Sequence, residues 1–232
     1  MLKAVLFDLD DTLYAYNPCH EEGINQLVSY LTLAWGLKKE DVLAKYESSR
    51  RIVHDQLKET AASHHRLLYM TKLCESFDKN PITYAKYLEE VYWKGYFSRM
   101  ELNENVIPIF DDLVKRNVKI AIVTDLVAEI QYRKILYLGL EDYINVIVTS
   151  EEAGADKPNP AIFNLALNKL NLNSPDNVVF VGDSYSKDIF GANSVGIKAF
   201  WISNDTDPQK SNPMMIRVSD LKTLRGVIFD HV

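Results

Sequence analysis

The chain has 232 residues, a formal net charge of −6 and a hydrophobic content of 47%. This length suffices for one large domain, or for a main domain with a smaller one inserted into it. The negative charge and the lack of a long Lys/Arg run argue against a nucleic-acid polymer or a membrane surface as a partner.

Two further classes of protein are disfavoured. Cys19 and Cys74 lie far apart and outside any CxxC or Cys/His cluster, which argues against a disulfide framework and a zinc site. The apolar run at the start of the chain is too short for a signal peptide, and acidic residues follow it too closely. No apolar stretch approaches the ~20 residues of a membrane helix. A cytoplasmic protein is therefore expected.

The first predicted element is a buried strand that ends in carboxylates. Residues 4–7, "AVLF", form a continuous apolar run, which is typical of a strand buried on both faces of a parallel sheet. Asp8, Asp10 and Asp11 follow it directly. Carboxylates this close repel one another and lose solvation when buried. We therefore expect a cation, which the sequence does not supply, at this strand end.

Residues 17–99 are interpreted as an inserted all-helical domain, and residues 1–16 and 100–232 as the core. No convincing strand occurs in the insertion, and apolar residues recur there at helical spacing. The apolar sets are Ile24, Leu27, Val28 and Leu31; Val42, Leu43 and Tyr46; Leu67, Leu68 and Leu73; and Tyr84, Tyr87, Leu88 and Val91.

Strand-like runs and helical patterns alternate in the rest of the chain. Such alternation predicts an α/β core with a doubly wound, Rossmann-like parallel sheet, whose binding crevice lies beyond the carboxyl ends of the strands. Asn159 and Pro160 suit the start of one helix as N-cap and first helical residue. The strand-like runs are 120–123, 146–148, 178–181, 199–202 and 214–218, and the helical sets are Ile107, Phe110, Leu113 and Val114; Ile130, Ile135 and Leu138; and Ile162, Leu165, Ala166 and Leu170.

Polar residues follow three of these runs. Each has an ordinary explanation when taken alone, as a turn, a helix cap or an exposed lysine. If the strands are parallel, however, all of them converge on one crevice together with the acidic cluster. These residues are Thr124 and Asp125, then Lys157, then Asp183, Ser184 and Asp188.

Four segments carry a resemblance to a known family. In chain order, "FDLDDTL", "IVTD", "DKPNPAIF" and "VGDSYSKDIFGA" resemble the four motifs of the haloacid dehalogenase-like superfamily of hydrolases. The helical insertion resembles the cap domain that this family inserts directly after the first motif. The resemblance implies a phosphatase-type enzyme that works through an aspartyl-phosphate.

The residues themselves suit that chemistry. Mg²⁺ prefers oxygen ligands, so Asp8, Asp183 and the backbone carbonyl of Asp10 make a plausible site for it. Lys157 would neutralise a phosphoryl group and keep Asp8 ionised as the nucleophile. The metal, Lys157 and Thr124 would stabilise charge on the transferring group. Asp10 would protonate the leaving oxygen and later activate water.

The neighbouring polar residues receive lesser roles. Asp188 is expected to support the site from behind, through metal-bound water or Lys157, and Ser184 either caps a helix or contacts the metal through water. Asp11 serves the turn or stays solvated. Asp125 departs from the family pattern, which often has Asn there. We expect it to face the cap or a sugar hydroxyl of the substrate.

The cap also holds a cationic stretch that suits a second anionic group or a base of the substrate. Arg50 and Arg51 are the candidates for this contact. The competing interpretation, which we prefer, is that most of these side chains are solvated on helix surfaces. The stretch contains Arg50, Arg51, His54, Lys58, His64, His65 and Arg66.

Several reactions remain open on such a core. The expected one is Mg²⁺-dependent hydrolysis of a small phosphomonoester, such as a sugar phosphate or a nucleoside monophosphate, by a monomer or homodimer. A phosphomutase would use the same core. Phosphonate hydrolysis would need a cap lysine, for which Lys38, Lys39, Lys45 and Lys58 are available. Asp10 argues against a 2-haloacid dehalogenase, and the complete acidic set with Lys157 argues against a non-catalytic phosphate-binding module.

Overall fold

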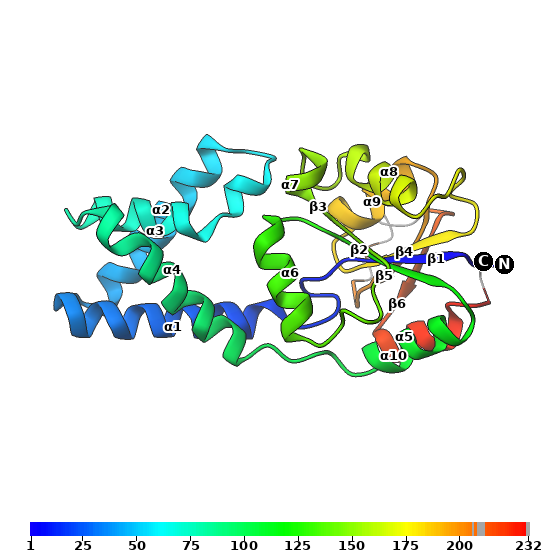
Figure 1. The fold of residues 1–232 in the computed structure, drawn as a ribbon, viewed down its shortest axis with the longest axis horizontal. Coiled ribbons are helices and arrows are strands. Elements are labelled where there is room, and N and C mark those ends of the chain that lie inside the picture. Colours follow the sequence, from blue (N-terminus) through cyan, green and yellow to red (C-terminus); the bar gives the residue numbers. More distant parts are fainter. Residues whose placement is uncertain (206, 208–211, 231–232) are drawn as a thin grey trace. The chain divides into compact units, whose positions relative to one another are not determined.

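A computed structural model describes residues 1–205, 207 and 212–230. The chain divides into two compact units, and the second is inserted into the first. Met1–Ala15 and the chain from Glu101 onward form an α/β unit, and Tyr16–Met100 forms a helical unit (Figure 1). No helix in the described residues is both long and apolar enough to cross a membrane.

The α/β unit is built on a six-stranded sheet in the order β3-β2-β1-β4-β5-β6, and every neighbouring pair is parallel. This confirms the predicted doubly wound sheet, and each of the six apolar runs forms a strand. The order reverses direction beside β1, which is where ligands bind in open sheets of this kind. The strands are β1 (Ala4–Phe7), β2 (Lys119–Thr124), β3 (Val146–Thr149), β4 (Val178–Gly182), β5 (Lys198–Ile202) and β6 (Met215–Val218).

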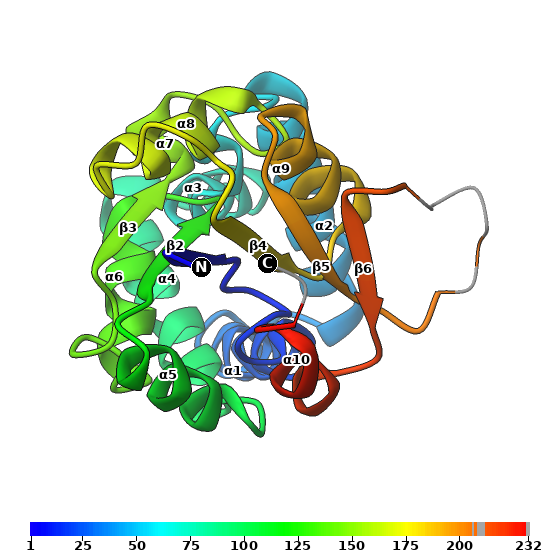
Figure 2. The same ribbon diagram turned by 90° about the vertical axis from the view of Figure 1, so that its right-hand side faces the viewer.

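Helices cover both faces of this sheet (Figure 2). On one face Phe163 of α8 packs against Phe180 of β4, with ring centroids 5.4 Å apart. On the other face Phe110 of α5 packs against Phe7 of β1 at 5.1 Å. Burying a side chain of this size contributes about 1.5–3 kcal/mol. The helices are α5 (Val106–Lys115), α6 (Ala128–Tyr137), α7 (Ser150–Ala153), α8 (Pro160–Lys169), α9 (Phe190–Ser194) and α10 (Leu221–Val227), and η2 (Tyr185–Ile189) is a π-helical turn.

Two local predictions about these helices have different outcomes. Asn159 accepts a hydrogen bond from the Ala161 N–H at 2.9 Å with Pro160 in the first turn, so the predicted start of α8 is confirmed. The predicted inner face of α5 is partly wrong, because Val114 is 51% exposed. The buried side of α5 instead carries Val106, Ile109, Phe110 and Leu113.

The helical unit consists of α1 (Tyr16–Trp35), α2 (Lys39–Gln56), η1 (Ala61–His64), α3 (Arg66–Ser76) and α4 (Pro81–Ser98). Helices α1 and α4 approach closely at two glycines. A Cβ on Gly23 would lie 2.8 Å from the Tyr92 ring, and a Cβ on Gly95 would lie 2.8 Å from the Glu22 carbonyl. Their small residues are therefore required for this packing.

The helical spacing predicted most of the buried positions of this unit, with exceptions on three helices. Leu43 and Tyr87 are exposed, at 37% and 49%. In α3 the buried residues include Arg66, Tyr69 and Met70, whereas Leu67 and Leu68 are half-buried. The buried face of α3 is therefore rotated from the predicted one, and it includes a charged side chain.

Candidate active site

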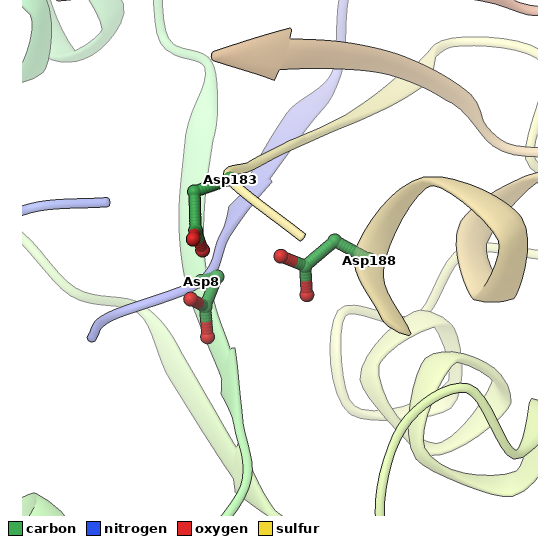
Figure 3. A group of neighbouring side chains, drawn as sticks. All are labelled: Asp8, Asp183 and Asp188. Carbon is green, nitrogen blue, oxygen red and sulfur yellow. The ribbon is translucent and has the colours of Figure 1, made fainter. Parts of the chain in front are cut away.

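Three carboxylates meet at the carboxyl end of the central strands. Asp8 directly follows β1, Asp183 directly follows β4, and Asp188 lies in η2. β1 and β4 are parallel neighbours with Phe7 opposite Val181, so Asp8 and Asp183 leave the sheet at the same edge. One carboxylate oxygen from each residue lies within 4.8 Å of those of the other two. Figure 3 shows the three side chains turned toward one another.

Lys157 supplies the positive charge of this cluster. It precedes α8, and its side chain is buried between β1 and η2. Its Nζ lies 2.6 Å from Asp8 Oδ1 and 2.7 Å from Asp188 Oδ1, and it also donates to the Val123 carbonyl at 3.2 Å. The ammonium is thus fixed in position by three acceptors, two of them charged.

One ammonium is not enough to balance the cluster. Burial raises the pKa of Asp8 well above its usual value despite the opposing effect of Lys157, and the charges of Asp188 and Asp10 raise it further. Burial, followed by the charges of Asp188 and Asp11, raises the pKa of Asp183 to about 6. Conversely, Asp188 and Asp8 raise the pKa of Lys157 well above its usual value against the effect of burial. The cluster therefore lacks positive charge at neutral pH.

The donor set fits a hard divalent cation. All three groups offer carboxylate oxygens, which Mg²⁺ prefers. Asp183 forms no ion pair within the described part of the chain, so its carboxylate is available to a ligand. Asp188 is less available, because one oxygen accepts from Lys157 and the other from the Ser184 N–H at 3.0 Å. The predicted contribution of the Asp10 carbonyl stays a prediction.

Gly182 and Ser184 shape the loop that carries Asp183. A Cβ on Gly182 would lie 2.4 Å from Asp188 Oδ2, so the Asp188 carboxylate can occupy its place only beside a glycine. Ser184 immediately precedes η2, and its hydroxyl makes no capping hydrogen bond. Ser184 therefore does not cap this turn, and its contact with the metal through water stays a prediction. Asp11 is exposed in a turn with φ 61°.

Asp10 is held by two residues of α6 that the sequence did not reveal as part of the site. Lys134 Nζ lies 2.6 Å from Asp10 Oδ1, and Gln131 Nε2 donates to Asp10 Oδ2 at 3.0 Å. The Tyr14 hydroxyl also donates to Asp10. Burial alone would raise the pKa of Asp10, but Lys134, Tyr14 and Gln131 together outweigh it, and the pKa lies below its usual value. Asp10 is therefore ionised.

Lys134 and Gln131 share one face of α6 at a spacing of three residues, which is the only trace of their role in the sequence. Both are completely buried. A lysine within a helix is ordinarily expected at the surface, so its burial was not predictable from the chain alone.

Thr124 and Asp125 continue from β2 into the same region. Thr124 is completely buried and its Oγ1 accepts from Gln131 Nε2 at 2.6 Å. Asp125 accepts from the Lys157 backbone N–H at 2.8 Å and from Lys187 Nζ at 2.8 Å. Asp125 thus positions the segment that carries Lys157. Its predicted contact with a substrate stays a prediction.

Arg50 and Arg51 belong to the other unit. Both lie exposed on α2, and Arg50 pairs with Glu47 at 3.3 Å. The core residues of the predicted site come together within the α/β unit, whereas these two arginines belong to the helical unit. Their role in substrate binding is untested.

The chain is similar to several known proteins. A family model described as haloacid dehalogenase-like hydrolase matches residues 2–196. The chain is 37% identical over 215 residues to a ribulose-1,5-bisphosphate 5-phosphatase of Halopiger xanaduensis, covering 91% of this chain and 90% of that relative. It is 34% identical to a glyceraldehyde 3-phosphate phosphatase of Methanopyrus kandleri, covering 85% and 82%. A crystal structure of a phosphatase of this family from Thermococcus onnurineus superposes with a TM-score of 0.73 at 27% identity, covering 98% of both chains.

Proposed function

Because the chain belongs to the haloacid dehalogenase-like hydrolase family, we propose that it is a Mg²⁺-dependent phosphatase of a small phosphorylated metabolite, with Asp8 as nucleophile. The observation that carries this proposal is the buried cluster of Asp8, Asp183 and Asp188 around Lys157. Its excess of negative charge favours a divalent cation. A cation together with Lys157 then makes the cluster attractive to a phosphoryl group.

Asp8 and Asp183 would hold the Mg²⁺ ion, with Asp188 behind them. When bound, the ion supplies Lewis-acid stabilisation of the phosphoryl oxygens. A nucleophilic carboxylate must be ionised, but burial raises the pKa of Asp8 and so opposes its ionisation. The raised pKa therefore supports a bound cation beside Asp8, because a cation favours the ionised form. Lys157 provides part of the compensation through its 2.6 Å contact.

The first chemical step is attack by a carboxylate oxygen of Asp8 on phosphorus. It forms an acyl-phosphate bond and releases the alcohol of the substrate. Lys157 balances the charge of the transferring group. Thr124 contributes a hydroxyl at the end of β2, and Gln131 fixes that hydroxyl at 2.6 Å. Positioning of this kind lowers the entropic part of the barrier.

Asp10 would handle both proton transfers. The contact with Lys134 favours its ionised form, which is the form that accepts a proton from water during hydrolysis of the acyl-phosphate. To protonate the leaving oxygen in the first step, Asp10 must instead enter that step protonated. We infer that the arrangement of Lys134, Gln131 and Asp10 described above belongs to the hydrolytic step.

The class of substrate follows from the relatives. Two of them are named for ribulose 1,5-bisphosphate and for glyceraldehyde 3-phosphate, both of which are phosphorylated sugars. We therefore propose a sugar phosphate as the substrate, ahead of a nucleoside monophosphate.

Phosphate release from ribulose 1,5-bisphosphate, glyceraldehyde 3-phosphate and a generic aryl phosphate tests this function, with Mg²⁺ or with EDTA. Turnover should require Mg²⁺ and vanish in Asp8→Asn. Asp10→Asn should lose a factor of about 10²–10⁴, the usual contribution of a positioned acid or base. Asp142→Asn is the control, because Asp142 is an exposed carboxylate outside the cluster, and it should keep near wild-type rates. Activity in EDTA or in Asp8→Asn would contradict the proposal.

A further inference from the structure

Arg66 is a buried cation that none of the core chemistry uses. It is the first residue of α3 and is 5% exposed. One terminal nitrogen of its guanidinium donates to the His64 carbonyl at 2.7 Å, and the other donates to the Tyr16 hydroxyl at 2.7 Å. Its Nε is buried and has no acceptor. A buried charge with an unused donor is costly unless something completes its contacts.

No carboxylate in the described chain forms an ion pair with Arg66. Glu89 of α4 is a buried carboxylate of the same unit, but it pairs with Lys86 at 2.8 Å. Aromatic rings take the place of an acid around Arg66. The guanidinium carbon lies 5.3 Å from the ring centroid of Tyr69, 5.4 Å from that of Tyr92 and 5.5 Å from that of Trp93.

These rings make the positive charge tolerable, because the face of an aromatic ring attracts a cation. They do not satisfy the Nε–H, which is buried and has no hydrogen-bond partner. The aromatic surroundings therefore explain why the cation can be buried and leave its unused donor unexplained.

A second polar group of the same cluster also lacks a partner. Tyr46 of α2 is 4% exposed, and its buried hydroxyl forms no hydrogen bond. The Tyr46 ring lies 6.3 Å from the rings of both Tyr69 and His20, and His20 stacks on Tyr16 at 5.4 Å. Arg66 and Tyr46 thus present two unused donors in one aromatic cluster, and both could be satisfied by one group with several acceptor oxygens.

The edge of the cluster is formed by Tyr16 and His20, which are half-buried rather than fully buried. Burial and the nearby positive charge of Arg66, with a smaller effect of Arg50, lower the pKa of His20 to about 4. His20 is therefore neutral at neutral pH. Arg66 forms no ion pair with a carboxylate of the described residues, so its positive charge favours entry of an anion.

We propose that Arg66, with the hydroxyls of Tyr46 and Tyr16, forms an anion-binding site within the helical unit for a phosphate or carboxylate group of a small molecule. Arginine matches the planar, multi-oxygen geometry of both groups. Two sources could supply the anion: a second anionic group of the substrate itself, or a separate small-molecule anion. Only the first source depends on the proposed phosphatase function.

Three variants of the full chain separate binding from folding. Tyr46→Phe removes only the unpartnered hydroxyl, so the fold should be at least as stable as the wild type. Arg66→Met removes the cation with a side chain of similar length. Lys72→Met is the matched control, because it removes an exposed charge from the same helix, where Lys72 pairs with Glu75 at 2.8 Å.

Calorimetric titration with inorganic phosphate in EDTA tests the site directly. Without metal, the carboxylates of the core repel anions, so the titration reports on the helical unit. Wild type and Lys72→Met should bind one phosphate per chain. Affinity should fall about tenfold or more in Arg66→Met and by a smaller factor in Tyr46→Phe. If no saturable binding occurs in the wild type, or if folded Tyr46→Phe binds phosphate as tightly as the wild type, the proposal is overturned.

Kinetics with Mg²⁺ then distinguish the two sources. If the site holds a second group of the substrate, Tyr46→Phe and Arg66→Met should raise KM for ribulose 1,5-bisphosphate and leave that for glyceraldehyde 3-phosphate unchanged. If the anion is separate, the ratio of the two kcat/KM values should stay constant in both variants while phosphate binding is lost. Phosphate binding by a chain that hydrolyses neither of these compounds nor the aryl phosphate would refute the phosphatase and keep the anion site.

Discussion

Replacing Asp183 by Asn should stabilise the metal-free protein, although the residue is proposed to be essential for activity. The Asp183 carboxylate lies close to those of Asp8 and Asp188, and it forms no ion pair in the described residues. Burial, followed by the charges of Asp188 and Asp11, raises its pKa to about 6. Its ionised form is therefore disfavoured in the folded protein, whereas an amide of the same shape carries no such penalty.

The size of the effect follows from the pKa difference. A pKa of about 6 in the folded state, against 3.8 for an unperturbed aspartate, corresponds to about 3 kcal/mol at neutral pH. The carboxylate is partly exposed, and screening by solvent reduces this to about 1–2 kcal/mol. Because the folded-state pKa is the higher one, the wild type carries no such penalty below about pH 4, and the penalty grows to its full size as the pH rises through about 6.

Urea unfolding of wild type and Asp183→Asn in EDTA, at about pH 5 and at neutral pH, measures this effect. The variant should be the more stable protein at neutral pH, and its advantage should shrink at about pH 5. Saturating Mg²⁺ should reverse the order, because a ligand at about 100 times its Kd adds about 2.7 kcal/mol to the wild type. The exposed Asp142→Asn is the control, with a change within about 0.5 kcal/mol. A metal-free Asp183→Asn that is less stable than the wild type at neutral pH would refute the reasoning.

Three further predictions concern buried groups. Lys157→Met should abolish turnover and cost about 3–5 kcal/mol of unfolding free energy, because it leaves Asp8 and Asp188 buried without their cation; an equally stable variant in urea would contradict this. Gly182→Ala should cost about 1–3 kcal/mol and most of the activity, because the new methyl group overlaps Asp188, and unchanged kcat would argue against that packing. Cys74 is buried, and burial followed by the charge of Glu75 raises its thiol pKa to about 11. A thiol reagent at neutral pH should therefore label Cys74 only after unfolding, and rapid labelling in native buffer would show that the thiol is accessible.

The sheet was predictable from the sequence because its strands are buried on both faces. Runs such as residues 4–7 and 178–181 contain no polar residue, and parallel strands in doubly wound folds have this composition. Once the strands were assigned, the meeting of Asp8 and Asp183 followed from topology alone. Parallel neighbours necessarily deliver the residues that follow them to the same edge of the sheet.

The buried residues that the sequence did not predict are those whose burial depends on the orientation of a helix about its own axis. Lys134 and Arg66 are both cations within helical segments, and a sequence gives no reason to bury them. Each is buried because its helix turns that side chain inward, toward Asp10 in one case and toward a ring of tyrosines in the other. The compensating groups lie far away in the chain, so helical periodicity could not reveal them.

In the proposed reaction Asp8 forms a covalent bond to phosphorus. Rapid acid quenching of the enzyme with ribulose 1,5-bisphosphate and Mg²⁺, followed by peptide mass spectrometry, tests it directly. We expect one phosphoryl group on the peptide that contains Asp8, present during turnover and absent in Asp8→Asn and in EDTA. Steady turnover of the substrate with no phosphoryl group on that peptide, or with the group on another residue, would contradict it.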